Sequence, residues 1–216
     1  PFRPLGYDRG RYFFLPSGRQ VVGLNTLGKG DLLKLAPLSY WKERFPLGKG
    51  IGWDDAADAL MSECHEVGIF DVARIRGRGA WVEGESIVLH LGDHLVRDGK
   101  PSPLDAPGAY IYEASSPIRL CHEKPMKAGE AIHLLRTAEL LTWERPLHAA
   151  LFSGWCALAP ICGALEWRPH IWITGAASSG KSWVYRHLLT RMLGDCAVTA
   201  ASESTEPGLR QSLGSD

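Results

Sequence analysis

Residues 175–182 carry the pattern whose residue types and spacing predict a defined chemistry. A glycine is followed, after four residues, by Gly-Lys-Ser. Apolar residues at 171–173 precede this loop, and a helical pattern follows it. The glycines at the two ends permit backbone angles that turn successive N–H groups toward phosphate oxygens. The pattern therefore predicts a phosphate-binding loop between a strand and a helix, formed by Gly175, Ala176, Ala177, Ser178, Ser179, Gly180, Lys181 and Ser182.

Two side chains of this predicted loop have roles that follow from their chemistry. Lys181 is long enough to reach the β- and γ-phosphates of a nucleotide, and we expect it to act as the catalytic cation. We expect the Ser182 hydroxyl to complete the coordination of Mg²⁺. The expected cofactors are therefore ATP and Mg²⁺. The alternative is a chance match to a short pattern in a glycine-rich chain.

A phosphate-loop ATPase also needs an acidic residue at the end of another apolar strand, where it holds Mg²⁺ and orients water. Residues 197–200 are expected to form a second strand, but Ser202-Glu203-Ser204 follows it rather than a pair of carboxylates. We expect these carboxylates, any sensor residue and any arginine finger to lie beyond Asp216. The chain, which begins at Pro1, is then a piece of a longer protein, and on its own it should not hydrolyse ATP efficiently.

The composition is that of a soluble globular protein, with 45% hydrophobic and 22% charged residues. The formal net charge is zero, and acidic and basic residues balance in both halves of the chain. Nucleic-acid binding would therefore depend on a local basic patch rather than a global field. The five cysteines are an odd number without compact spacing, and no cleavable signal segment is visible. A reduced, cytoplasmic setting is expected.

Residues 146–165 form an uncharged stretch long enough to span a membrane. His148, Ser153, Gly154 and Pro160 interrupt it. We therefore expect a buried core helix that breaks near the proline, and no membrane partner.

The first half of the chain alternates between strand and helix patterns. Hairpins are expected at 12–24 and 80–91, and a further strand at 109–113. Two helices are expected, one capped by Asp31 and interrupted at Pro37, the other opened by Asp54 or Asp55, running from Ala56 to Val67 and ending at Gly68. Breaks are expected at 100–103 and 115–117.

The second half reads as helical until the predicted loop. Residues 130–143 have helical spacing, and Thr205 should cap a last helix that begins near Pro207. The expected fold class is an α+β accessory or linking domain at 1–120, followed at 121–216 by a helical lead-in and the first part of an α/β ATPase core.

Arg74, Arg76 and Arg78 alternate with other residues just before Trp81. On an extended segment alternate side chains share a face, so the three guanidiniums could bind nucleic-acid phosphates. The competing interpretation is a solvated strand edge whose charges discourage aggregation.

Four other groups of residues are open to two interpretations. Cys64-His65 and Cys121-His122 lack compact zinc spacing, and Cys156 and Cys162 are more typical of buried small hydrophobes. Three tryptophans lie near the loop, namely Trp167, Trp172 and Trp183. Packing is the favoured interpretation for them, and stacking on adenine is the alternative. Arg210 and Gln211 could face a neighbouring subunit or DNA, but a surface helix without such a role is favoured.

Several segments also resemble the region that leads into the ATPase of phage- and plasmid-encoded primase–helicase proteins. They are Gly6-Tyr7-Asp8 with Tyr12-Phe13-Phe14, Leu35-Ala36-Pro37 with Tyr40-Trp41, Gly68-Ile69-Phe70-Asp71 with residues 74–81, His90-Leu91-Gly92-Asp93, Arg168-Pro169-His170-Ile171-Trp172, and Ser204-Thr205-Glu206 with Leu209-Arg210-Gln211. In these proteins a helicase of the AAA+ or superfamily III kind follows a primase or linking domain. The resemblance implies a hexameric, ATP-driven motor on single-stranded DNA, with an AAA+-like core.

Three functions therefore remain open at the level of sequence. The first is a DNA-replication ATPase of a mobile element, with helicase activity. The second is a nucleotide-gated switch ATPase whose N-terminal part is a protein-interaction module. The third, a small-molecule kinase, is disfavoured because compact kinases usually begin near their phosphate loop.

Overall fold

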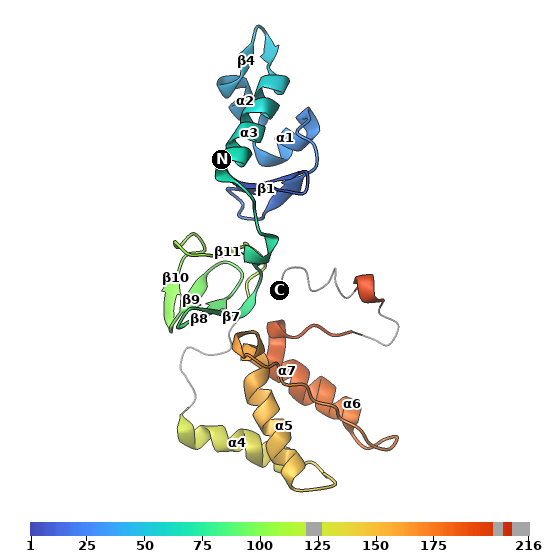
Figure 1. Cartoon of the computed structure of the whole chain (residues 1–216). Helices are drawn as coiled ribbons and strands as arrows, with labels where there is room; N and C mark the ends of the chain where they lie inside the picture. Colours follow the sequence, from blue (N-terminus) through green and yellow to red (C-terminus); the bar gives the residue numbers. More distant parts are fainter. Residues whose placement is uncertain (120–126, 201–204, 209–216) are drawn as a thin grey trace. The chain divides into compact units, whose positions relative to one another are not determined.

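A computed structural model describes residues 1–119, 127–200 and 205–208, and within these ranges the fold is mixed α+β. The chain forms two compact units. Unit 1 consists of Pro1–Arg76 and Leu104–Ala114, and unit 2 consists of Gly77–Pro103 and Ser115–Asp216. Figure 1 shows the elements of each unit. The predicted hairpins and most of the predicted helices are present, with the differences given below.

The sheet of unit 1 has three antiparallel strands in the order β1-β2-β3, where β1 is Phe2–Asp8, β2 is Arg11–Pro16 and β3 is Val22–Leu24. Strands β2 and β3 form the predicted hairpin, whereas sequence analysis did not predict β1. Three consecutive residues of β2, namely Phe13, Phe14 and Leu15, are buried. Because successive strand residues point to opposite faces, this sheet is covered on both sides.

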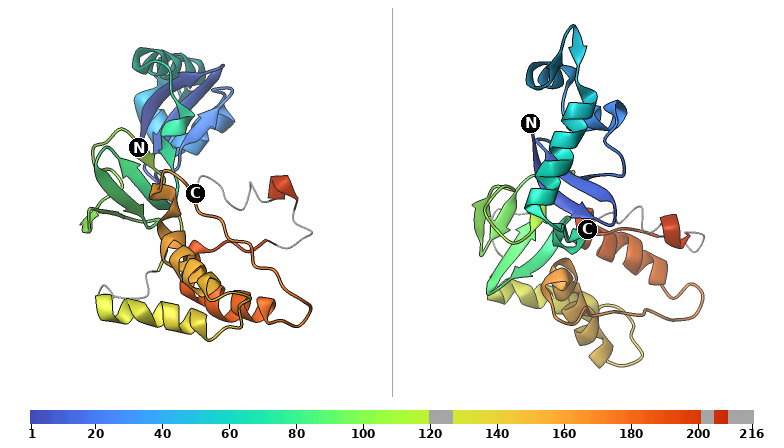
Figure 2. Two further views of the ribbon diagram at one scale, coloured as in Figure 1. Left: turned by 60° about the horizontal axis from the view of Figure 1, so that its bottom comes forward. Right: turned by 45° about the horizontal axis from the view of Figure 1, so that its top comes forward.

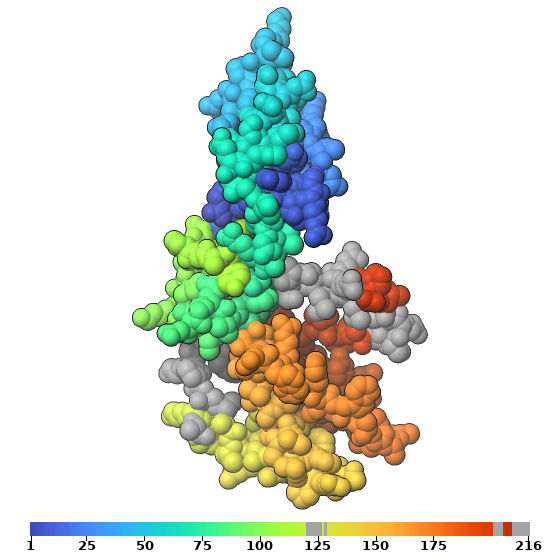
Figure 3. Space-filling model, viewed as in Figure 1, coloured from blue at the N-terminus to red at the C-terminus, as the bar shows by residue number. Residues whose placement is uncertain are grey.

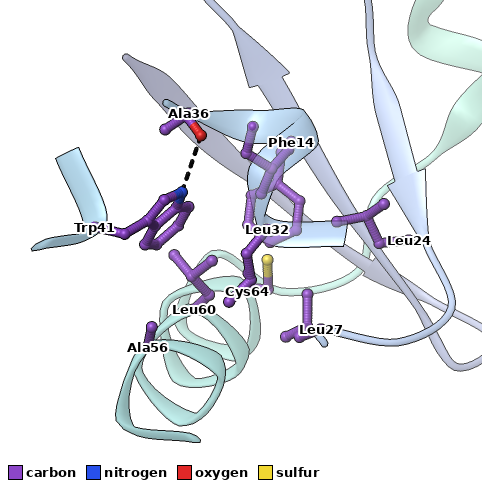
Figure 4. Packing of buried hydrophobic residues seen from close by; sticks show 10 residues of the cluster. Phe14, Leu24, Leu27, Leu32, Ala36, Trp41, Ala56, Leu60 and Cys64 are labelled. Atoms are coloured by element: carbon purple, nitrogen blue, oxygen red, sulfur yellow. Dashed lines mark hydrogen bonds between the residues drawn. The ribbon is translucent and has the colours of Figure 1, made fainter. Parts of the chain in front are cut away.

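Helices cover one face of this sheet (Figure 1). They are α1 (Lys29–Leu35), α2 (Leu38–Arg44) and α3 (Trp53–Val67), and a short hairpin of β4 (Pro46–Leu47) and β5 (Gly50–Ile51) joins the last two. Figure 4 shows Phe14 packed with Leu32, Leu60 and Cys64 from the helices. Trp41 is fully buried, and its indole nitrogen donates to the Ala36 carbonyl at 3.0 Å. The indole therefore joins the core without leaving its polar atom unsatisfied.

The predicted interruption at Pro37 is confirmed, because this proline precedes the first residue of α2. The prediction that Asp31 caps α1 is wrong. The N-cap is Gly28, and Asp31 lies in the first turn, where its carboxylate accepts from Thr26 and Lys34. These bonds hold the pKa of Asp31 below its usual value, the bond from Lys34 contributing most.

Helix α3 ends where predicted, because Gly68 adopts a φ of 96° that disfavours a side chain. The helix begins at Trp53, so Asp54 and Asp55 lie within its first turn rather than before it. There their negative charge complements the helix N-terminus.

A second, smaller core lies on the other face of the unit 1 sheet. Phe13 and Leu15 pack there with Phe70 and with Ile111 of β11 (Ile111–Tyr112). Strand β11 is parallel to β6 (Ile75–Arg76), so the predicted strand at 109–113 is confirmed only over two residues.

The sheet of unit 2 has four antiparallel strands in the order β10-β9-β8-β7. Strands β7 (Gly79–Glu83) and β8 (Ser86–His90) form the predicted hairpin. Strand β9 (Leu95–Arg97) pairs with β10 (Lys100–Ser102) across a tight turn. Residues 100–102 are therefore a strand rather than the predicted break. Pro101 is accommodated because β10 is an edge strand.

The helical part of unit 2 begins with α4 (Ala128–Glu139), which starts and ends earlier than predicted. Helix α5 (Leu147–Leu158) follows and continues as a 3₁₀ helix at Ala159–Ala164. A helical run then extends from α6 (Lys181–Trp183) through a π-helical segment at Val184–Leu189 to α7 (Thr190–Leu193), and a 3₁₀ turn at Gly194–Cys196 ends it. Helix α5 lies between α4 and this run (Figure 2), because Phe152 packs with Ala138 and Val184.

The uncharged stretch changes helix type at Ala159, next to the predicted break at Pro160. It is not the buried core helix that the sequence predicts. One face of α5 is buried, but Leu147 and Leu151 are 64% and 60% exposed. Residues Leu147–Ala164 are long and apolar enough to cross a membrane by length and composition, and a single helix of this kind is weak evidence for a span.

Two predicted strands are wrong. Residues 170–174 and 197–200 are not assigned as strands, because no segment in the described ranges pairs with them. Thr205 does cap the last described helical turn, since its hydroxyl accepts from the Gly208 N–H at 3.3 Å.

The boundary predicted near residue 120 lies outside the described residues. The two compact units group residues 77–103 with the helical part of the chain, whereas the sequence analysis placed them in the accessory domain. The accessory domain at 1–120 therefore stays a prediction.

Replacing Trp41 with Ala should lower the free energy of unfolding of unit 1 by about 3–5 kcal/mol, because it removes a fully buried ring and leaves a cavity. Urea unfolding followed by far-ultraviolet circular dichroism measures this change. The control is Leu38→Ala in the same helix, where the side chain is 53% exposed and the expected change is within about 0.5 kcal/mol. Equal effects of the two substitutions would contradict the core described above.

Candidate phosphate-binding loop

The segment that leads into the predicted loop is extended, although it has no strand partner among the residues that the structure describes. Between 169 and 174 every second residue is half-buried and the others are exposed, which is the alternation of an extended chain. Ile171 and Ile173 pack against the cluster around Phe152. The indole of Trp155 in α5 donates to the Pro169 carbonyl at 3.2 Å. Helix α5 therefore fixes the start of the loop.

The loop itself turns sharply in two places. Ser178 has a φ of 60° and Gly180 a φ of 90°, both in the left-handed region. Glycine adopts this geometry without cost, whereas a serine there is strained. The Ser179 N–H donates to the Ala176 carbonyl at 3.3 Å, which closes a turn inside the loop. Residues 175–180 are exposed and form part of the outer surface of unit 2 (Figure 3).

Lys181 folds back over the loop. Its Nζ donates to the carbonyls of Gly175 at 2.6 Å and Ala176 at 2.7 Å, and approaches the Ser179 hydroxyl at 3.4 Å. An ammonium group has three N–H donors, and the loop supplies three oxygens for them. The cation is thereby held over the backbone ring that the sequence predicts as a phosphate cradle.

The helical run begins immediately after the loop. Gly180 is its N-cap, and the Val184 N–H donates to the Gly180 carbonyl at 3.0 Å. The first N–H groups of a helix have no partner within it and carry a partial positive charge. The start of the run therefore presents N–H groups and the Lys181 ammonium at the same end of the helix, an arrangement that suits an oxyanion.

Ser182 lies in the first turn of the run and is exposed. Over the described ranges, no group of three His, Cys, Asp or Glu side chains is placed to hold a metal ion. Ser202, Glu203 and Ser204 lie outside the described residues. The hydroxyl of Ser182 is thus the candidate magnesium ligand that the described loop offers.

The three tryptophans near the loop are not packed as predicted. Trp167, Trp172 and Trp183 are 74%, 90% and 57% exposed. Trp172 lines a pocket of about 250 Å³ together with Trp143 and Glu144 from the segment between α4 and α5 and with His148 from the first turn of α5. Sequence analysis did not identify these three residues. No spacing could have shown them, because an extended segment and a helix connection distant in the chain form the pocket together.

Arg74, Arg76 and Arg78 do not form a single extended stripe. Arg74 ends a 3₁₀ helix (Val72–Arg74), and its Nε donates to the Ala109 carbonyl at 2.8 Å. Arg76 donates to the Ala73 carbonyl and lies over the Tyr110 ring. Arg78 belongs to unit 2 and donates to Ser116. The premise of one shared face is therefore wrong, because these guanidiniums bind backbone carbonyls of two separate units.

Of the described cysteines, Cys64 and Cys156 are buried and Cys196 is exposed. Cys64 lies in the unit 1 core, where burial raises its pKa despite backbone hydrogen bonds that lower it. Burial raises the pKa of Cys156 to about 11, so its thiol stays protonated at neutral pH. Cys162 is half-buried, so its predicted burial is only partial. Cys121-His122, Arg210 and Gln211 lie outside the described residues.

Comparison of the chain with protein-family models, with curated proteins and with solved structures gave no match in any of the three.

Proposed function

We propose that this chain contains the nucleotide-binding part of an ATP-driven DNA-replication protein with helicase activity, and that residues 175–182 bind the phosphates of ATP. The observation that carries the proposal is the position of Lys181, whose ammonium lies against the carbonyls of Gly175 and Ala176. This contact keeps the cation at the loop before any phosphate arrives. A phosphate oxygen can replace a carbonyl as acceptor without moving the lysine away from the loop.

The electrostatics of the loop support phosphate as its ligand. The ammonium of Lys181 and the N–H groups at the start of the helical run lie at one end of the same element. During phosphoryl transfer, negative charge develops on the γ-phosphate and the leaving oxygen. A fixed ammonium at that position stabilises the charge more in the transition state than in the ground state, which is the condition for a catalytic cation.

An aromatic surface beside the loop supports a nucleotide rather than a free phosphate. The exposed indole of Trp172 lies three residues before Gly175 and lines the pocket that also contains Trp143. A purine base stacks on such rings. Stacking there would place the base on the side of the loop where the extended segment enters.

The residues of the loop fit a magnesium ion only in part. Mg²⁺ bound with ATP would neutralise charge on the β- and γ-phosphates, and the Ser182 hydroxyl is the protein oxygen suited to hold it. The chain's own contribution is the loop, Lys181 and Ser182.

The helicase part of the proposal, its hexameric state and its single-stranded DNA substrate rest on the family resemblance. One observation favours the alternative of a nucleotide-gated switch with a protein-interaction module. Arg74, Arg76 and Arg78 donate to carbonyls within the protein, which leaves fewer of their N–H groups for the predicted contact with nucleic-acid phosphates.

Replacing Lys181 with Ala should weaken ATP binding by the 216-residue chain at least tenfold. The reason is that a charge-assisted hydrogen bond contributes about 1.5–3 kcal/mol, and about 1.4 kcal/mol corresponds to a factor of ten. Fluorescence titration with a labelled ATP analogue measures the affinity. Arg191→Ala, which removes one exposed cation from the same helical run, is the control and should leave the affinity within about twofold. Unchanged affinity in a folded Lys181→Ala variant would refute the site.

The 216-residue chain should not show efficient Mg²⁺-dependent ATP hydrolysis, because no strand in the described ranges pairs with the segment before the loop and could bring an acidic residue to it. Steady-state phosphate release with and without Mg²⁺ tests this expectation. Robust metal-dependent turnover would contradict it, and Glu203 or Glu206 would then be the first residues to replace.

Replacing Arg74, Arg76 and Arg78 together with Ala distinguishes the two functions. If all three contact single-stranded DNA, the slope of log affinity against log salt flattens by about two units, since each contact contributes about 0.7. Fluorescence anisotropy with a labelled oligonucleotide measures this slope. Because the guanidiniums bind carbonyls, we expect a smaller change than this. A two-unit flattening of the salt slope in a folded variant would instead indicate that all three arginines contact single-stranded DNA.

A further inference from the structure

Unit 1 contains a polar pocket that is separate from the candidate phosphate-binding loop of unit 2. It has a volume of about 290 Å³ and is lined by Arg3 of β1, Arg19 of the turn between β2 and β3, and the segment 104–111. Asp105-Ala106-Pro107-Gly108 and Tyr110 are among the residues of that segment that line it. Its size, close to the lower end of small-molecule sites, suits a ligand of a few to about a dozen heavy atoms.

Four hydrogen bonds fix the frame of this pocket. The guanidinium of Arg19 donates to the Leu104 carbonyl at 2.8 Å, and the Ala114 N–H donates to the Arg19 carbonyl at 2.9 Å. Gln20 donates to the Ala114 carbonyl at 3.2 Å, and the Val21 N–H donates to the Glu113 carboxylate at 2.6 Å. The turn and the segment 104–114 are thus held together on both sides of the cavity.

Arg19 is held in an unusual conformation. Its φ is 58°, in the left-handed region that costs a non-glycine residue about 1–2 kcal/mol. Backbone strain of this kind concentrates at sites where the surrounding structure must place one side chain accurately. Here it aims the side chain toward Leu104, at the edge of the pocket.

The guanidinium of Arg19 has donors that the described residues do not use. Of the five N–H groups of an arginine, one donates to Leu104, and the enclosed Nε has no acceptor within the described ranges. Partial burial lowers the pKa of Arg19, an effect that Asp105 opposes and Arg3 reinforces. The Nε of this cation is thus enclosed without an acceptor among the described residues.

Two further cations lie beside the same pocket. Arg3 is exposed, and none of the described residues accepts a hydrogen bond from its side chain. Arg76 lies 4.1 Å from the centre of the Tyr110 ring and so adds positive charge behind that wall. Asp105 is the acidic residue that lines the pocket. The cavity therefore carries more positive than negative charge, with unused donors on both lining arginines.

We propose that this pocket of unit 1 binds a phosphate monoester between Arg3 and Arg19. A phosphate monoester offers three acceptor oxygens and nearly two negative charges, which two guanidiniums match better than they match a single carboxylate. The remaining volume holds the small group that bears the phosphate, next to Tyr110. This site is independent of the candidate phosphate-binding loop, and the monoester comes either from a small metabolite or from the 5′ end of a nucleic-acid strand.

Calorimetric titration of the Lys181→Ala chain tests the proposal, since this background removes the main cation of the other site. The probes are glycerol 3-phosphate, a short 5′-phosphorylated oligonucleotide and the same oligonucleotide with a 5′-hydroxyl. We expect saturable binding of a phosphorylated probe. Binding of glycerol 3-phosphate identifies a metabolite site, and a preference for the 5′-phosphorylated over the 5′-hydroxyl strand identifies a strand end.

Three variants in the same background assign the binding to the pocket. Arg3→Gln, whose side chain makes no hydrogen bond with the described residues, should weaken binding about tenfold without affecting folding. Asp105→Asn should strengthen it about threefold, because it removes the negative charge of the wall. Arg9→Gln, at a side chain that is 93% exposed in the neighbouring turn, is the matched control and should have no effect. Absence of binding by the phosphorylated probes, or equal affinity in Arg3→Gln and Arg9→Gln, overturns the proposal.

Discussion

The packing of Ile171 and Ile173 on helix α5 is the interaction on which the candidate phosphate-binding loop depends. These two side chains hold an extended segment against the helix although the segment has no strand partner in the described ranges. The segment in turn delivers Gly175 to the start of the helical run, where Lys181 meets the loop carbonyls. Loss of that apolar contact would leave the loop residues unchanged in chemistry but without a fixed position.

The parts of the fold that local patterns control agree with the sequence. A hairpin needs two alternating segments and a turn, and both predicted hairpins are present. Pro37 interrupts a helix because its ring fixes φ and removes a donor, and Gly68 ends one because it alone adopts a φ of 96° easily. The phosphate-binding role of residues 175–182 stays a prediction, although Lys181 does contact the Gly175 and Ala176 carbonyls. These features depend on residues close together in the chain.

The parts that failed depend on partners far away in sequence. Residues 170–174 have the pattern of a strand, but a strand also requires a neighbour that supplies hydrogen bonds. Asp31 is an exception to this, because the partners that bind its carboxylate inside the first turn, Thr26 and Lys34, are its neighbours in sequence. The pocket around Trp172 and the pocket between Arg3 and Arg19 each combine segments that no local spacing relates. Alternation of Arg74, Arg76 and Arg78 could not reveal that a unit boundary falls between the last two.

The two units interleave along the chain, since the polypeptide leaves unit 1 after Arg76, returns at Leu104 and leaves again after Ala114. Unit 1 therefore consists of two separate stretches of sequence, and the parallel pairing of β6 with β11 joins them. A protease cut at either of the first two crossings would leave the two pieces of unit 1 held together by non-covalent contacts alone. Any subcloned fragment that ends near residue 76 would lack the wall of the Arg3 and Arg19 pocket. The shortest continuous piece of chain that contains all of unit 1 therefore also contains the four-stranded sheet of unit 2.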